Sequence, residues 1–321
     1  MKSILELLEQ CRLCPRQCEI NRLEGQKGYC GVGDKIIIAH YGLHHGEEPP
    51  ISGTRGSGTI FFSFCNLRCV FCQNYQISQD GMGQGISPEE LTEIFLILQT
   101  QGCHNINLVS PVPYIPYIAT AIGEARRGGL TIPVVYNTNA YESVEALQVL
   151  DGLIDIYLPD FKYWSPAIAE KLSGIPKGKP YPDFAKAALL EMKRQVGDLV
   201  VEGGIAKKGL LLRHLVLPNG LAGSKEIFQW VAESLGVNTR ISLMSQYYPT
   251  NEAHRFPLLR RKIRPEEYNA VMEYLLDEGF GNVFVQEIES ASLFVPDFAD
   301  DEPFHAEKNK THKTKEKIPG Q

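Results

Sequence analysis

The chain has 321 residues, of which 43% are hydrophobic and 22% are charged, and its formal net charge is −6. This composition is ordinary for a soluble globular protein with a large core, and the acidic balance argues against nucleic acid or a membrane surface as a partner. The N-terminus lacks the basic start and long apolar core of a signal peptide, and no apolar run is long enough to span a bilayer. We therefore expect a cytoplasmic protein with one αβ-barrel domain and a small appendage.

Seven of the eight cysteines lie in two tight groups, which in a chain without a secretion signal indicates metal binding rather than disulfides. The first group lies near the N-terminus and consists of Cys11, Cys14, Cys18 and Cys30. Four thiolates can close a tetrahedral zinc site or ligate every corner of an iron–sulfur cluster, and both alternatives stay open. The segment Cys11–Gly33 is too short for a core of its own, so we expect a metal to order it.

The second group follows the first predicted strand of the barrel. The apolar run Thr59–Phe64 leads into a C-x3-C-x2-C loop formed by Cys65, Cys69 and Cys72. Three thiolates suit a [4Fe-4S] cluster and leave one of its four irons without a protein ligand, which is typical of a reactive metal site. Zinc held by the same three cysteines is the alternative, but no histidine has a motif-like spacing to them. We therefore predict an iron–sulfur cluster at this loop.

Beyond the loop, strand-like runs alternate with helical patterns. The predicted strands are Thr59–Phe64, Asn105–Val109, Pro133–Asn137, Ile154–Leu158, Leu210–Leu217, Arg240–Met244 and Asn282–Gln286. The clearest helix begins after Ser87, because Pro88 suits the first helical position and Glu90 completes a capping box. The alternation predicts an α/β fold, a full or partial (βα) barrel of about six to seven parallel units, with an open doubly wound sheet as the alternative.

Composition divides the chain into three predicted parts. These are an N-terminal cysteine-rich segment over 1–52, a barrel domain over 53–296 and a tail over 297–321. The tail is polar and rich in lysine, so we expect it to be solvated and without fixed structure.

The central loop resembles the signature of radical S-adenosylmethionine (radical SAM) enzymes, in which an aromatic residue, here Phe71, commonly precedes the last cysteine. Within that superfamily, the chain is similar to uncharacterised homologues of pyruvate formate-lyase activating enzyme over about residues 11–290. The matching stretches include Cys14-Pro15-Arg16-Gln17-Cys18, the run from Gly53 to Asn74, Asn105–Val109, Leu158–Tyr163 and Arg213–Pro218.

The resemblance implies a specific chemistry and specific partners. The iron without a protein ligand binds S-adenosylmethionine, and one electron from the reduced cluster breaks the C5′–S bond. The resulting 5′-deoxyadenosyl radical removes a hydrogen atom from a substrate. The implied partners are an electron donor such as flavodoxin or ferredoxin and, as protein substrate, a glycyl-radical enzyme. Radical modification of another protein, an RNA or a small molecule is the alternative within the enzyme class, and a non-catalytic iron–sulfur electron carrier is the alternative outside it.

The resemblance also suggests which side chains meet the cofactor at the carboxyl ends of the strands. Most relatives carry a Gly-Gly-Glu turn after the second strand, and this turn meets the amino group of S-adenosylmethionine. This chain has Ser110 followed by prolines instead. Either Ser110 or a nearby carbonyl makes the contact with the amino group, or the turn has only a structural role. The other candidates have turn or surface contacts as their structural alternative. The full set of predicted cofactor-binding residues is Phe71, Ser110, Asn137, Asn139, Asp160, Lys162 and Arg213.

Among these candidates, Arg213 interrupts an otherwise apolar strand. A charge in such a place needs a partner. The carboxylate of S-adenosylmethionine would suit the guanidinium fork, and a structural salt bridge is the competing interpretation.

Overall fold

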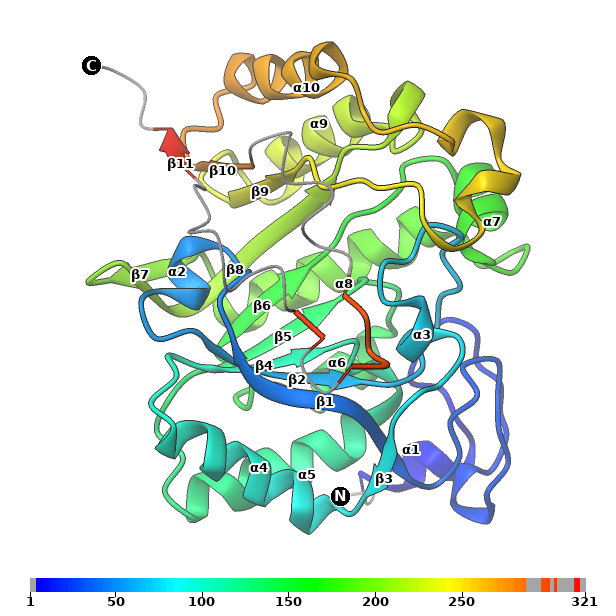
Figure 1. The fold of residues 1–321 in the computed structure, drawn as a ribbon, viewed down its shortest axis with the longest axis vertical. Coiled ribbons are helices and arrows are strands. Elements are labelled where there is room, and N and C mark those ends of the chain that lie inside the picture. The colour runs from blue at the N-terminus through cyan, green and yellow to red at the C-terminus, as the bar shows by residue number, and fades with distance from the viewer. Residues whose placement is uncertain (1–3, 287–295, 301–302, 305–314, 318–321) are drawn as a thin grey trace.

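The computed structural model describes residues 4–286, 296–300, 303–304 and 315–317 (Figure 1). Its centre is a sheet in which seven strands run parallel, in the order β10-β9-β8-β6-β5-β4-β2. The strands are β2 (Ser57–Phe62), β4 (Ile106–Val109), β5 (Val134–Thr138), β6 (Ile156–Pro159), β8 (Ile205–Leu215), β9 (Arg240–Met244) and β10 (Val283–Val285). Each coincides with a predicted strand, and the partial-barrel prediction is confirmed.

Four further strands were not predicted, and all of them pair antiparallel. They are β1 (Ile36–His44) and β3 (Gln84–Ile86) beyond β2, β7 (Val200–Glu202), which forms a hairpin with β8, and β11 (Lys315–Lys317) beside β10. The order ends at β3 on one side and β11 on the other, so the described strands form an open rather than a closed barrel.

Helices cover the outer face of the sheet (Figure 1). The longer ones are α4 (Pro88–Thr100), α5 (Ile115–Arg127), α7 (Pro166–Ser173), α8 (Tyr181–Val196), α9 (Ser224–Ser234) and α10 (Pro265–Asp277). Short helices are α1 (Glu6–Glu9), α2 (Pro49–Ser52), α3 (Tyr75–Ser78) and α6 (Val144–Gln148). The predicted capping box is present, since Glu90 N–H donates to Ser87 Oγ at 3.1 Å and Ser87 N–H donates to Glu90 Oε2 at 2.7 Å. No described helix has the length and apolarity that a bilayer crossing requires.

Alternation along the strands separates two apolar layers. One face of β2, with Ile60 and Phe62, packs in the large core beneath the helices. The opposite, inner face of the sheet carries a smaller cluster that includes Val135, Leu158 and Leu211, and Ile51 of α2 packs into it. Since successive side chains of a strand point to opposite faces, polar residues in register with these inner positions lie inside the barrel.

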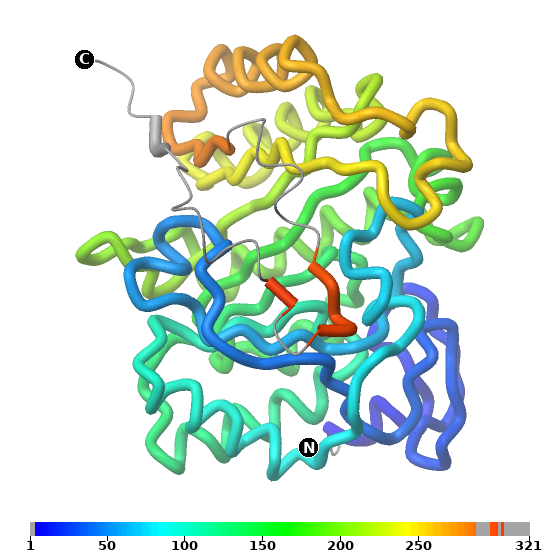
Figure 2. Tube along the Cα trace, in the orientation of Figure 1, coloured from blue at the N-terminus to red at the C-terminus, as the bar shows by residue number. Residues whose placement is uncertain are grey.

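Phe298 and Phe304, two described residues beyond β10, lie on the inner face of β2. The ring of Phe298 lies 5.5 Å from that of Phe61, and the ring of Phe304 lies 5.1 Å from it. In Figure 2 the described stretches around these two residues run in front of β1 and β2. Residues 297–300 and 303–304 therefore differ from the solvated tail that we expected, because Phe298 and Phe304 pack against the ring of Phe61. The predicted tail otherwise falls outside the described residues, except for the backbone of β11.

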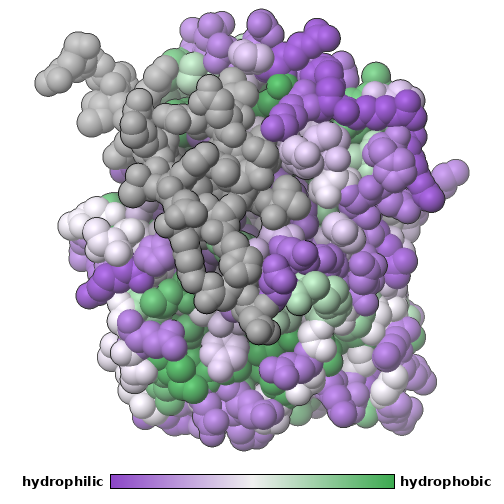
Figure 3. All heavy atoms as spheres, in the orientation of Figure 1, coloured by the Kyte–Doolittle hydropathy of each residue, from purple (hydrophilic) through white to green (hydrophobic). Residues whose placement is uncertain are grey.

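The visible surface is unevenly polar. Figure 3 shows hydrophilic residues over the α10 side of the molecule and more hydrophobic residues in the lower half, where Figure 1 has β1 and α4. Leu43 of β1 and Ile97 of α4 are among the exposed large apolar residues, at 44% and 43%.

Candidate active site

The cysteine loop begins where β2 ends, at the carboxyl edge of the parallel strands. Two backbone hydrogen bonds tie it to the end of α7: Arg68 N–H donates to Ser173 O at 3.1 Å, and Val70 N–H donates to Leu172 O at 2.9 Å. A crossover helix more than a hundred residues away therefore fixes the loop. In a barrel with parallel strands, this edge is where reactive sites usually lie.

Cys65 receives two N–H donors. Leu67 N–H points at Cys65 Sγ at 3.4 Å, and Asn139 Nδ2 lies 3.3 Å from the same sulfur. Asn139 Nδ2 also donates to Asn66 Oδ1 at 2.8 Å, and Asn139 Oδ1 accepts from Tyr141 N–H at 2.9 Å. The Asn139 amide is thus committed to the loop itself. Asn139 thus positions Cys65, and the cofactor contact that we predicted for it stays a prediction.

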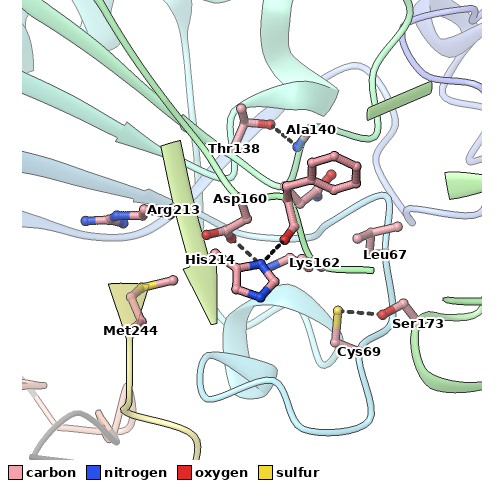
Figure 4. Close-up of polar contacts among 12 residues, drawn as sticks. Leu67, Cys69, Thr138, Ala140, Asp160, Lys162, Ser173, Arg213, His214 and Met244 are labelled. Atoms are coloured by element: carbon pink, nitrogen blue, oxygen red, sulfur yellow. Dashed lines mark hydrogen bonds and ion pairs between the residues drawn. The ribbon is translucent and has the colours of Figure 1, made fainter. Parts of the chain in front are cut away.

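The other two thiols each have a serine partner. Cys69 Sγ lies 3.0 Å from Ser173 Oγ (Figure 4), and Cys72 Sγ lies 3.2 Å from Ser78 Oγ. Ser173 Oγ is in turn 2.7 Å from the hydroxyl of buried Tyr163. Hydroxyl donors directed at sulfur stabilise the thiolate form that binds metal.

The donor set fits an iron–sulfur cluster. Burial raises the pKa of Cys65 to about 12 and that of Cys72 to about 11, and it raises the pKa of Cys69 as well. Without metal these thiols would stay neutral, so a metal group must supply the positive charge that ionises them. Among the residues that the structure describes, no three His, Cys, Asp or Glu side chains converge on one ion position. The ligands of a four-iron cluster bind different irons and lie farther apart than ligands of a single ion.

A cation lies beside the loop. Lys162 Nζ pairs with Asp160 Oδ2 at 2.5 Å, and both side chains are 20% exposed. Burial opposes the charge on Lys162, but Asp160 and the Cys69 thiol outweigh burial and raise the pKa of Lys162. Lys162 is therefore charged at every working pH, and its field reaches Cys65, Cys69 and Cys72. The structure brings these two predicted residues together with the cysteine loop.

We expect Lys162→Met to make the reduction potential of a cluster at this loop more negative. Reduction adds negative charge, and the variant removes the nearby positive charge that offsets it. Formation of 5′-deoxyadenosine with a fixed reductant should fall about tenfold, which corresponds to roughly 1.4 kcal/mol. A redox titration followed by electron paramagnetic resonance measures the potential, and Lys162→Arg serves as the charge-conserving control. An unchanged potential in Lys162→Met would contradict the role of this charge.

Ser110 and Asn137 end two neighbouring strands. The backbone N–H of Ser110 donates to Asn137 O at 3.0 Å, so the two residues sit side by side at the carboxyl edge. Both are partly exposed, and within the described residues neither side chain has a hydrogen-bond partner. They are therefore available to a ligand at the mouth of the site.

The backbone at this edge is strained in three places. Phe64, Ser110 and Ala140 directly follow or lie close after β2, β4 and β5, and their φ angles are 67°, 59° and 59°. Non-glycine residues rarely adopt this left-handed region, and such residues cluster at active sites and ligand clamps. The strain is consistent with a binding site at the ends of these three strands.

Arg213 forms a salt bridge inside the protein, and its predicted contact with a cofactor stays a prediction. Its guanidinium donates to Glu48 at 2.7 Å and 2.6 Å and also pairs with Glu47. Burial alone would raise the pKa of Glu48, but Arg213 outweighs burial and lowers it. Asn107 Nδ2 donates to Glu47 Oε1 at 2.8 Å and extends the network. In Figure 4 the Arg213 side chain points away from Cys69. The salt bridge that the sequence offered as the competing interpretation is therefore present.

Phe71 lies in the core beside the loop. It is 7% exposed, and its ring contacts those of Tyr247 at 5.5 Å and Tyr163 at 6.5 Å. The aromatic residue thus anchors the loop between Cys69 and Cys72, and its predicted contact with a cofactor stays a prediction.

Sequence reasoning missed several residues that complete the site. They are Ser78, Tyr163 and Ser173 around the thiols, and Glu47, Glu48 and Glu142 inside the protein. A serine in a helical pattern carries no signal of a distant sulfur partner. Glu47 and Glu48 did carry a signal, because two adjacent carboxylates and a single arginine within an apolar strand suggest an ion pair.

Glu142 follows β5 and is buried with a raised pKa. Tyr136 OH donates to Glu142 Oε2 at 2.7 Å, and the Thr138 hydroxyl also donates to the carboxyl group. Burial is the largest effect and raises the pKa of Glu142 from 4.5 to about 7, although both hydroxyl donors lower it. Glu142 therefore supports the strand end that carries Asn139.

We expect the stability of the protein to fall as the pH rises from about 4.5 to about 7 through Glu142. The folded state holds this proton more tightly than the unfolded state, so its contribution is complete below pH 4.5 and is lost as the carboxyl ionises, by up to about 3 kcal/mol. Glu142→Gln keeps a neutral partner for both hydroxyls. Thermal unfolding of both proteins between pH 5 and pH 8 measures the effect. Equal pH slopes would show that Glu142 is not the titrating group.

The four N-terminal cysteines are near neighbours. The charges of Cys11, Cys18 and Cys30 all act on Cys14, and burial raises the pKa of Cys14 to about 12. The structure thus brings together the predicted first group.

Comparisons with known proteins agree with this geometry. The family model described as Radical SAM superfamily matches residues 59–195, which span the cysteine loop and the strands that follow it. The uncharacterized protein MJ0674 of Methanocaldococcus jannaschii is 31% identical over 277 residues, which cover 83% of this chain and 74% of the relative. The uncharacterized protein MJ0808 of the same organism is 27% identical over 158 residues, 44% of this chain and 46% of that one.

Among solved structures, the fold is similar to that of HydG, a maturase of the [FeFe]-hydrogenase. The TM-score is 0.51 and the sequence identity 17%, and the match covers 74% of this chain and 53% of HydG. The chain therefore spans about half the length of HydG, and at this identity the likeness concerns the fold alone. The chain belongs to the radical SAM superfamily. Members of this superfamily use a [4Fe-4S] cluster and S-adenosylmethionine, as predicted.

Proposed function

We propose that the protein is a radical SAM enzyme that cleaves S-adenosylmethionine reductively and abstracts a hydrogen atom from a substrate. The observation that carries the proposal is the trio of half-buried thiols at the carboxyl edge of the barrel, with Lys162 beside it. When bound, the cluster and S-adenosylmethionine supply an electron transfer that breaks the C5′–S bond and yields a carbon radical.

In this proposal the residues of the chain have distinct roles. Cys65, Cys69 and Cys72 bind three of the irons, and Lys162 offsets the negative charge that accumulates there on reduction. Ser110 and Asn137 offer hydrogen bonds to the polar groups of the cosubstrate. The apolar inner face of the sheet keeps water from the reacting groups and holds the target near them.

The electron must come from outside the chain, because a radical SAM enzyme needs a one-electron reductant. We propose a small cytoplasmic carrier such as flavodoxin or ferredoxin. The substrate that the sequence resemblance supports is a glycyl-radical enzyme, in which the radical forms on a backbone glycine and is stabilised by its flanking amides.

Two assays test these steps separately. After anaerobic reconstitution with iron and sulfide, dithionite and S-adenosylmethionine should yield 5′-deoxyadenosine. Protein that carries only zinc at the loop, or iron whose spectrum does not respond to S-adenosylmethionine, would overturn the proposal. Incubation with a glycyl-radical enzyme should then give the electron paramagnetic resonance doublet of a glycine radical, and 5′-deoxyadenosine without that doublet would leave the chemistry standing and exclude that substrate.

A further inference from the structure

We propose that Cys11, Cys14, Cys18 and Cys30 hold a second metal centre, separate from the loop site, whose negative charge is balanced by the buried side chain of Arg22. The proposal uses residues that have no part in the function proposed above. Its ligands are thiolates, and the centre is an iron–sulfur cluster rather than a single ion. Among the described residues no three ligating side chains converge on one ion position, whereas the ligands of a cluster bind different irons.

The backbone is shaped to gather these four thiols. Cys11 N–H donates to Ile20 O at 3.0 Å, and Glu19 N–H donates back to Cys11 O at 3.1 Å, which closes a tight loop around Cys14 and Cys18. Inside this loop Gln17 and Glu19 have φ angles of 47° and 53°. The left-handed region is unfavourable for non-glycine residues, so the loop is held in a conformation that its local sequence does not favour.

At Gly28 the backbone passes close to the thiol of Cys18. A Cβ atom on Gly28 would lie 2.9 Å from Cys18 Sγ, so only glycine lets the backbone at this position approach the thiol. All four cysteines are free thiols in the structure. The four thiols therefore lie in one segment, and none of them is in a disulfide.

Arg22 is the second and independent observation. Its side chain is 1% exposed; Nε donates to Gly33 O at 3.0 Å and Nη1 donates to Pro113 O at 2.6 Å. Nη2 is buried and has no hydrogen-bond partner, and within the described residues no carboxylate forms an ion pair with Arg22. A buried guanidinium without an anion is strongly unfavourable.

The anionic partner that the structure offers is the cysteine group. Arg22 lies between Cys18 and Cys30 in the sequence, and its Nε donates to the carbonyl of Gly33, three residues after Cys30, so its charge lies near the cysteine group. Arg22 also reaches Tyr114, whose hydroxyl burial keeps neutral. Neutral thiols would leave the guanidinium without a counter-charge, whereas four thiolates on a metal provide one. Burial of Arg22 and metal binding by the cysteines therefore require each other.

The proposed centre is attached to the loop of the active site. Arg16, which lies between Cys14 and Cys18, donates through Nε to Asn66 O at 2.7 Å and through Nη2 to Gly174 O at 2.6 Å. Its guanidinium lies 3.3 Å from the centre of the Tyr29 ring. Asn66 directly follows Cys65, so the N-terminal segment contacts the active-site loop itself.

A second contact joins the two cysteine groups from the other side. A Cβ atom on Gly31, the neighbour of Cys30, would lie 3.0 Å from the ring of Phe64, the neighbour of Cys65. Figure 2 shows the N-terminal segment folded against the side of the barrel. The N-terminal segment therefore contacts the loop that carries Cys65, and a cluster that orders this segment would also fix the position of the loop.

Metal analysis of loop variants tests the proposal. A variant with Cys65, Cys69 and Cys72 all changed to Ala leaves the N-terminal group untouched, and after anaerobic purification it should retain bound metal. Iron with acid-labile sulfide identifies the cluster. A folded loop variant that contains no iron, or zinc in its place, would overturn the proposal. Adding Cys14→Ser and Cys18→Ser to this variant should remove the remaining metal, and Cys103→Ser should not.

Variants of Arg22 test the counter-charge with a different readout. Release of the N-terminal metal to a chelator should be about tenfold faster in Arg22→Met than in the wild type, since residues that support metal ligands affect affinity by roughly 10–100-fold. Arg22→Lys keeps the charge and should restore most of the retention. Equal release rates for wild type and Arg22→Met, with both proteins folded, would overturn the role of Arg22.

Discussion

Cys69→Ala is expected to abolish 5′-deoxyadenosine formation and to remove the cluster from the active-site loop. Cys69 is the middle ligand of the trio, lies 3.0 Å from Ser173 Oγ and feels the charge of Lys162. A four-iron cluster held by only two thiolates loses both affinity and the geometry that leaves one iron for the cosubstrate. The loss should exceed roughly a thousandfold, because an alanine at this position offers the third iron no soft ligand.

Cys103→Ser is the matched control for this prediction. Cys103 is buried and its thiol donates to Leu98 O at 3.1 Å, a bond that a serine hydroxyl can make. Iron content, the visible absorption of the cluster and product formation should all stay at the wild-type level. Product formation in Cys69→Ala at more than a few per cent of wild type would show that the loop is not the cleavage site.

The second large effect concerns stability. Arg213→Met should destabilise the protein by about 3–5 kcal/mol, because it leaves the carboxylates of Glu47 and Glu48 buried without a cation. Both carboxylates are less than a tenth exposed, so water cannot compensate for the loss. Urea denaturation at neutral pH measures the change in the free energy of unfolding.

A compensated variant separates this role from cofactor binding. Glu47→Gln with Glu48→Gln and Arg213→Met removes all three charges and should recover most of the lost stability, since uncharged groups in the same place avoid the desolvation cost. A single Arg213→Met variant that keeps its stability but binds S-adenosylmethionine more weakly would instead restore the ligand role that the sequence suggested.

Asn139 and Ser110 differ in a way that a sequence pattern cannot predict. Both are polar residues at the ends of predicted strands, and both were expected at the mouth of the site. The structure uses the Asn139 amide on Cys65 and Asn66, whereas the Ser110 side chain has no partner among the described residues. Strand ends place a residue at the edge of a sheet, but the local turn then decides where its side chain points.

Contacts between residues that are far apart in the sequence could not be predicted from it. Arg213 and Glu48 are 165 positions apart, and Cys69 and Ser173 are 104 apart. Periodicity and motif spacing carry no information about such pairs. The polar composition of 297–321 likewise gave no sign that Phe298 and Phe304 would pack on Phe61.

The sequence alone determined the seven parallel strands and the cysteine loop after the first of them. These features can be predicted because they depend on residues close together in the sequence: the periodicity of strands and helices, the capping residues and the spacing of ligands. The partners of the buried charges, of Asn139 and of Arg22 came only from the folded chain. Burial makes an unpaired charge or polar group costly, and which distant group meets that need depends on how the strands are brought together.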